Sequence, residues 1–99
     1  MNNKVTILTI TGSDSTGGSG VQADIKSITS LGGYAASAIT AVVVQDTGGI
    51  EHLYDIPAEI LDAQLQRVAM DLRPDSVKIG LLRSVEQVET VAALLRKLP

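Results

Sequence analysis

The sequence of 99 residues contains no cysteine, no phenylalanine and no tryptophan, and aromatic residues make up only 2% of it. Without cysteine the chain has neither a disulfide framework nor a thiolate metal site. Its core must be built from aliphatic side chains, because the large aromatic ones are missing. Hydrophobic residues still amount to 44%, which is typical of a globular domain and excludes an intrinsically disordered chain.

Positive charge and long apolar runs are also scarce. Eight Lys and Arg stand against eleven Asp and Glu, for a net charge of −3, and no basic cluster occurs. This balance argues against nucleic acid or an anionic membrane as the main partner. No run approaches the length of about 20 residues that a membrane helix needs, and residues 1–11 lack the features of a signal peptide. We therefore expect a cytoplasmic protein. The lone His52 has no neighbouring ligand set, so we expect no metal site.

Glycine, by contrast, is concentrated in one stretch, where residues 12–20 read GSDSTGGSG. An apolar run precedes this stretch and an amphipathic helical pattern follows it. A strand, a glycine-rich turn and a helix in this order are typical of a ligand loop above the carboxyl end of a parallel strand. Glycine also builds ordinary connecting loops. We favour a functional loop, because glycine lets the backbone approach a ligand closely.

Two nucleotide motifs match this stretch weakly. Residues 12–19 have the spacing of a phosphate-binding P-loop, but Gly18 stands where the lysine is needed. Residues 18–23 fit the dinucleotide-binding pattern, yet in that pattern the first glycine follows the strand almost directly. Here a whole loop intervenes. Neither motif by itself predicts a nucleotide site.

The remaining pattern alternates between strands and helices. Nearly continuous apolar, β-branched segments predict buried parallel strands at residues 4–11, 34–45 and 76–82. Residues 50–56 predict a short strand or hairpin arm. Apolar residues at helical spacing predict helices over residues 21–31, 57–73 and 84–97. The order β-α-β-arm-α-β-α predicts an α/β fold with right-handed crossovers.

Local signals refine these elements. Ser19 is placed to cap the first helix, and Ser84 with Gln87 has the spacing of a capping box for the last. Gly80 interrupts the third strand, which indicates a close approach by a ligand or by backbone. The inner faces expected for the first and last helices consist of Val21, Ala23, Ile25, Ile28 and Leu31, and of Val85, Val88, Ala92 and Leu95.

Three long parallel strands make a narrow sheet, and at least one edge of it would be long and apolar. Natural proteins usually cover or charge such an edge. We therefore expect residues 1–99 to be the front portion of a larger α/β domain. The alternative is a complete small domain whose edge is covered by a partner or a second copy, so a homo-oligomer stays open.

Four blocks of the sequence resemble the hydroxymethylpyrimidine and phosphomethylpyrimidine kinases of thiamine biosynthesis. The blocks are TITGSDSTGGSGVQADIK, SAITA, QDTGGI and DSVKIGL, at residues 9–26, 37–41, 45–50 and 75–81. Pyridoxal kinases, which share the ribokinase-like fold, match the first block less well. The resemblance implies a ribokinase-like parallel-sheet sandwich, of which residues 1–99 form the N-terminal, substrate-binding portion.

The resemblance also implies an activity. These enzymes transfer the γ-phosphate of ATP to 4-amino-5-hydroxymethyl-2-methylpyrimidine or to its monophosphate. By motif position, two residues would lie beside the substrate, two would hydrogen-bond the pyrimidine and two would pack near its ring. In that order these pairs are Gly12 and Ser13, Asp24 and Gln45, and Val43 and Leu81.

Other interpretations of these residues and of the chain stay open. Asp24 also suits the positive end of a helix dipole, Gln45 suits a turn, and Val43 and Leu81 suit a core. Ser15 stands where the family often has proline. The family's ATP and Mg²⁺ sites and its catalytic loop lie mostly beyond residue 99. We therefore expect no catalytic residue and no independent activity in this chain. A non-catalytic pyrimidine-binding module, an inactive fragment and a pyridoxal kinase-like enzyme are the alternatives.

Overall fold

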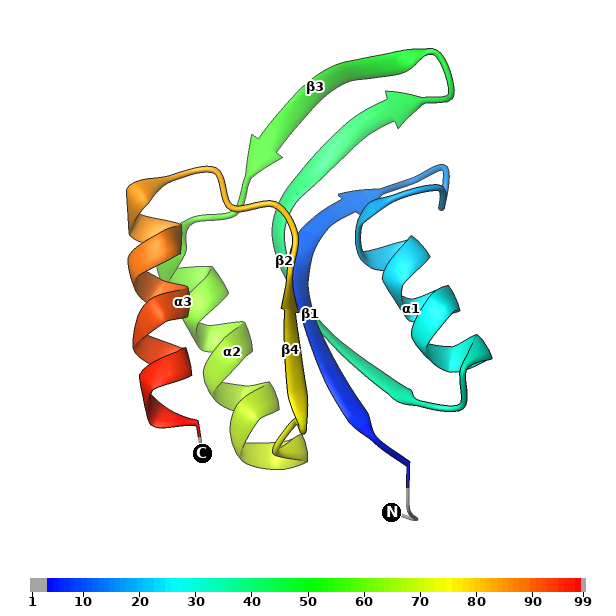
Figure 1. The fold of residues 1–99 in the computed structure, drawn as a ribbon. Coiled ribbons are helices and arrows are strands. Elements are labelled where there is room, and N and C mark those ends of the chain that lie inside the picture. Colours follow the sequence, from blue (N-terminus) through cyan, green and yellow to red (C-terminus); the bar gives the residue numbers. More distant parts are fainter. Residues whose placement is uncertain (1–3, 99) are drawn as a thin grey trace.

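The computed structural model describes residues 4–98 as a three-layered α/β structure (Figure 1). The element order agrees with the predicted one: β1 Thr6–Asp14, α1 Gly20–Ser30, β2 Tyr34–Asp46, β3 Gly49–Asp55, α2 Ala58–Leu72, β4 Ser76–Ile79 and α3 Val85–Lys97. The strands lie side by side as β3-β2-β1-β4. Strand β1 is parallel to β2 and β4, whereas β3 pairs antiparallel with β2. In the described part of the chain, no helix has the length and apolar character to span a bilayer.

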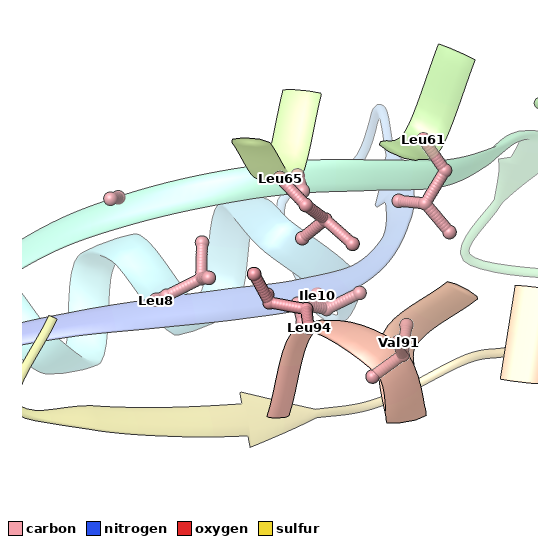
Figure 2. Close-up of a cluster of buried hydrophobic side chains, with 8 residues drawn as sticks. Leu8, Ile10, Leu61, Leu65, Val91 and Leu94 are labelled. Carbon is pink, nitrogen blue, oxygen red and sulfur yellow. The ribbon is translucent and has the colours of Figure 1, made fainter. Parts of the chain in front are cut away.

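Helix α1 covers one face of the sheet, while α2 and α3 cover the other. The main core lies between the sheet and the α2–α3 pair, where aliphatic side chains from four elements meet (Figure 2). In the register of β1 and β2, Leu8 lies opposite Ala36 and Ile10 lies opposite Ala38, and the leucines of α2 belong to the same buried cluster. Burying each such leucine stabilises the fold by about 1.5–3 kcal/mol. The buried cluster comprises Leu8, Ile10, Ala36, Ala38, Leu61, Leu65, Val91 and Leu94.

The prediction of which residues form the inner face of α3 is wrong. The helix buries Gln87, Val91 and Leu94, whereas Val85 is 68% exposed and Val88 is 49% exposed. Leucine and valine occur on both sides of this helix, so periodicity alone does not choose between the sides. The buried amide of Gln87 finds partners in the backbone below it, and this turns its side of the helix inward.

Helix α1 also differs from the prediction. Of its expected inner stripe only Val21 is fully buried, and Leu31 is 88% exposed. Leu31 follows the last helical residue as the C-cap, and Gly32 has a φ of +90°. The helix therefore ends at this point, as glycine permits, and the chain enters β2 at Tyr34, whose amide donates a 2.8 Å bond to the Val5 carbonyl.

Two strands are less covered than predicted. In the second half of β2, Ala41 and Val43 are buried but Val42 and Val44 are exposed. That half of β2 forms the arm with β3, where among the described residues no helix lies over the outer face. Strand β4 is shorter than the expected 76–82 and mostly exposed, because it is the edge strand next to β1.

Strand β1 is longer than predicted and runs through Gly12 to Asp14, with an irregular register against β2 between Thr11 and Ser13. At Gly80 the close approach comes from the side chain of Thr11, and not from backbone as one of the two expectations had it. A Cβ atom on Gly80 would lie 2.7 Å from the Cβ of Thr11. The hydroxyl of Thr11 also accepts a 3.0 Å hydrogen bond from the Leu81 amide. This contact positions Leu81 at the carboxyl edge of the sheet.

Candidate functional site

A cavity of about 240 Å³ opens at the carboxyl ends of β1 and β2. Its walls come from the glycine-rich loop, the β2–β3 arm and the segment after β4, which meet at this end of the sheet (Figure 1). Five of the six predicted site residues line it, and their contact with a substrate stays a prediction. The lining residues are Thr11, Gly12, Ser13, Asp14, Ser19, Gly20, Val43, Gln45, Ile50, Leu53, Leu81 and Arg83.

Gly12 and Gln45 show how the local backbone shapes this cavity. A Cβ atom on Gly12 would lie 3.2 Å from Leu81 Cδ2 and 3.4 Å from Val43 Cγ2. Glycine therefore keeps the space between these two side chains open. Gln45 follows a register irregularity in the β2–β3 pairing, after Val44. Irregularities of this kind re-aim side chains at the ends of strands.

Asp14, at the end of β1, organises the glycine-rich loop. One carboxylate oxygen accepts a 2.9 Å bond from the Thr16 amide, and the other accepts a 2.7 Å bond from the Ser19 hydroxyl. These hydrogen bonds, with that of Ser19 foremost, lower the pKa of Asp14. Ser19 is the N-cap residue of α1 as predicted, but its side chain makes no cap bond, because its hydroxyl is engaged by Asp14.

Gln22, in the first turn of α1, ties the helix to the cavity wall. Its Oε1 accepts a 2.8 Å bond from the Asp14 amide, and its Nε2 donates a 2.7 Å bond to the Ser13 hydroxyl. Ser13 is thereby oriented by a residue that the sequence analysis did not single out. The sequence did carry a signal for this role of Gln22, which is a long polar side chain in the first turn of a helix that follows a glycine-rich loop.

Asp24 is not among the residues that line the cavity, and its hydrogen bond to the pyrimidine stays a prediction. Its carboxylate accepts bonds from Lys78 Nζ at 2.7 Å and from the Thr9 hydroxyl at 2.5 Å. Thr9 and Lys78 are register partners in β1 and β4, so Asp24 ties α1 to both strands. Burial acts to raise the pKa of Asp24, but the bonds from Lys78 and Thr9 outweigh it and lower the pKa.

Arg83 is a second residue that the sequence analysis missed. It lines the cavity, and its Nε donates a 2.7 Å bond to Asp55 Oδ1 at the end of β3. This hydrogen bond raises the pKa of Arg83 further above its already high value. No spacing rule connects two residues 28 positions apart, so only the tertiary structure reveals the pair.

The glycine-rich loop does not fit the phosphates of a nucleotide. Within the loop, the Asp14 carboxylate accepts the hydrogen bonds that a bound phosphate would need, and the nearby ammonium of Lys26 donates a 2.9 Å bond to the Gly17 carbonyl. Over residues 4–98 no group of three His, Cys, Asp or Glu side chains is placed to hold a metal ion. The described residues around the cavity therefore do not fit ATP with Mg²⁺.

A larger hollow, of about 580 Å³, lies at the other end of α1. Val5, Ile7, Ile28 and Leu31 supply much of its wall. It is at the amino ends of the parallel strands, where ligands of α/β sheets are not usually bound. The smaller cavity at the carboxyl ends combines apolar walls with directed polar groups, and we take it as the candidate site.

The chain is similar to known proteins in both sequence and fold. The model of the phosphomethylpyrimidine kinase family matches residues 14–99. The hydroxymethylpyrimidine/phosphomethylpyrimidine kinase of Escherichia coli K12 is 44% identical over 94 residues, which cover 95% of this chain and 35% of that protein. The crystal structure of a phosphomethylpyrimidine kinase from Clostridium difficile 630 superimposes with a TM-score of 0.90 at 40% identity, over 95% of this chain and 41% of that one.

A pyridoxal kinase from Staphylococcus aureus, solved with pyridoxal, is also similar. Its TM-score is 0.87 at 30% identity, over 98% of this chain and 37% of that one. The same kinase has been solved with AMP-PCP and with ADP. The chain thus has the α/β fold of the ribokinase-like kinases over about 40% of their length. It spans about a third of the length of the Escherichia coli relative.

Proposed function

Because this chain belongs to the phosphomethylpyrimidine kinase family of thiamine biosynthesis, we propose that its carboxyl-edge cavity binds the pyrimidine substrate of such a kinase. The substrate would be 4-amino-5-hydroxymethyl-2-methylpyrimidine or its monophosphate. The observation that carries the proposal is the convergence of Gly12, Ser13, Val43, Gln45 and Leu81 around one cavity. Residues 1–99 then form the substrate-binding portion of a single ribokinase-like domain.

The cavity walls suit an uncharged heteroaromatic ring. Val43 and Leu81 offer apolar surfaces on either side of the space that Gly12 leaves open. The amide of Gln45 carries both a donor and an acceptor, which matches an amino group next to a ring nitrogen. Pockets of this type combine apolar walls with a few directed polar groups.

We expect the purified chain to bind the hydroxymethylpyrimidine, with Gln45→Leu weakening the binding about five- to thirtyfold. The lost amide hydrogen bonds are worth about 1–2 kcal/mol, and 1.4 kcal/mol corresponds to a factor of ten. Gly12→Ala should also weaken binding, because its methyl group enters the space beside Leu81 and Val43. Isothermal titration calorimetry measures both effects.

The matched control for this titration is Gln66→Leu on α2. It removes the same amide, which among the described residues donates an exposed hydrogen bond to Asp62, and it should leave the affinity unchanged. Absence of binding to the unaltered chain, or equal affinity in the Gln45 and Gln66 variants, would contradict the proposed site.

We further expect residues 1–99 by themselves to form no phosphorylated pyrimidine from ATP and Mg²⁺. Phosphoryl transfer needs the nucleotide, the metal ion and charge-stabilising groups aligned with the acceptor. The described residues around the cavity do not fit such groups. Product formation is followed by chromatography, with a full-length family kinase as the positive control. Turnover that disappears in Gln45→Leu would show that this chain holds a complete active site.

A second candidate is a pyridoxal-binding relative of these kinases. The TM-score of 0.87 with the Staphylococcus aureus pyridoxal kinase favours it, although the identity is only 30%, against 44% for the Escherichia coli pyrimidine kinase. Titration with pyridoxal under the same conditions separates the two. Tighter binding of pyridoxal than of the pyrimidine would favour this second candidate.

A further inference from the structure

The cavity contains one charged feature that an uncharged ring does not need. Among its described lining residues Arg83 is the only cation, and Asp14 is the only anion. The oxygens of Asp14 are engaged by Thr16 and Ser19. These hydrogen bonds hold the Asp14 carboxylate against the loop, and the guanidinium of Arg83 is the one cationic group of the described lining that can attract an anion.

We propose that Arg83 determines substrate specificity by binding the phosphate group of a phosphorylated pyrimidine. The cavity would then bind the monophosphate in preference to the free alcohol. This inference rests on the proposed function, because it concerns the second of the two substrates named there. Arginine suits the task, since its planar fork of N–H donors matches the oxygens of a phosphate group.

The pairing of Arg83 with Asp55 leaves this fork available. Nε makes the short 2.7 Å bond, whereas Nη2 reaches Asp55 Oδ2 only at 3.5 Å. The remaining N–H donors of the guanidinium have no partner among the described residues. The side chains of Arg83 and Asp55 are 36% and 48% exposed. Ion pairs with this much exposure to water contribute little to stability. A phosphate dianion can therefore bind the guanidinium while Asp55 still holds its Nε side.

The position of Arg83 is fixed by the protein core. Its backbone amide donates a 2.9 Å bond to Oε1 of the buried Gln87, whose Nε2 donates to the carbonyls of Thr40 and Ile56. The side chain thus starts from a rigid point at the rim, beside Leu81 on one side and the arm on the other. A preorganised donor of this kind loses little conformational freedom when the ligand binds.

The test compares two ligands on the purified chain by isothermal titration calorimetry: the hydroxymethylpyrimidine and its monophosphate. We expect the unaltered chain to bind the monophosphate roughly ten- to hundredfold more tightly, the range for hydrogen bonds to a charged group. Arg83→Met should abolish this preference, because it weakens binding of the monophosphate much more than binding of the alcohol. Arg83→Lys should keep part of it, since the charge remains but the fork is lost.

The matched control is Arg67→Met, which removes an equal charge from the exposed face of α2 and should preserve the preference. Asp55→Asn provides a second test of the Arg83 proposal that leaves Arg83 intact. It should keep or increase the preference, because it removes the competing carboxylate. Rising salt should reduce the preference of the unaltered chain.

Three results would overturn the inference, and they separate it from the proposed function. Alcohol and monophosphate binding equally well to the unaltered chain would reject the role of Arg83 and leave the pyrimidine site standing. An unchanged preference in Arg83→Met, with the variant shown to be folded by circular dichroism, would do the same. Failure of both ligands to bind would reject the proposed function together with this inference.

Discussion

Gly20→Ala is expected to destabilise the folded chain by about 2–4 kcal/mol, since it combines backbone strain with a steric clash. Gly20 has a φ of +63°, a conformation that residues with side chains rarely adopt. Its added Cβ would collide with the carbonyl oxygen of Gly12 and would lie 3.3 Å from the Asp14 amide nitrogen. Both neighbours belong to the backbone, so the end of β1 must move. Urea denaturation, followed by circular dichroism, measures the loss in the free energy of unfolding.

Gly32→Ala is the matched control for this substitution. Gly32 also has a positive φ, of +90°, but a Cβ there would meet nothing within 4 Å. The Gly32→Ala substitution should therefore lower the free energy of unfolding only through backbone strain, by on the order of 1–2 kcal/mol. Equal losses in the two variants would show that the contact between Gly20 and Gly12 contributes nothing to stability. A greater loss at Gly20 measures how closely the start of α1 packs on β1.

Gln87→Leu should cost about 2–4 kcal/mol of unfolding free energy, although the two side chains are similar in size. Gln87 is 1% exposed, and its amide serves three backbone groups. Without the Gln87 amide, the Ile56 carbonyl and the Arg83 amide lose the hydrogen-bond partners that they have in this structure. The Thr40 carbonyl still accepts a 2.9 Å bond from the Ile56 amide. Each buried polar group left without a partner costs about 1–3 kcal/mol.

Gln66→Leu again supplies the control, because the hydrogen bond of its amide to Asp62 is exposed. It should change the unfolding free energy by less than about 0.5 kcal/mol. If Gln87→Leu costs as little as this, the buried amide is not what holds α3 against the strand ends. A large loss at Gln87 alone would support the view that this residue selects the inner face of α3.

Local sequence patterns determined the order of the elements. Continuous apolar runs predicted β1 and β2, helical spacing predicted α2 and α3, and the antiparallel arm followed from a weaker alternation. These signals are local, because hydrogen bonding within a helix and pairing along a strand impose periods of 3.6 and 2 on the side chains. The candidate cavity was also largely predictable, since glycine and strand-end residues converge at the carboxyl edge of a parallel sheet.

Only the tertiary structure decided which side chains meet. Asp24 pairs with Lys78, 54 positions away, and Arg83 pairs with Asp55 across the rim of the cavity. In the same way, Gln87 rather than Val88 faces the core, because backbone carbonyls of distant segments lie where its amide can donate to them. Periodicity tells a helix from a strand, but the buried face and the partners of charged groups depend on what the rest of the fold brings near. Those contacts arise from sheet order and crossover geometry, which no local pattern encodes.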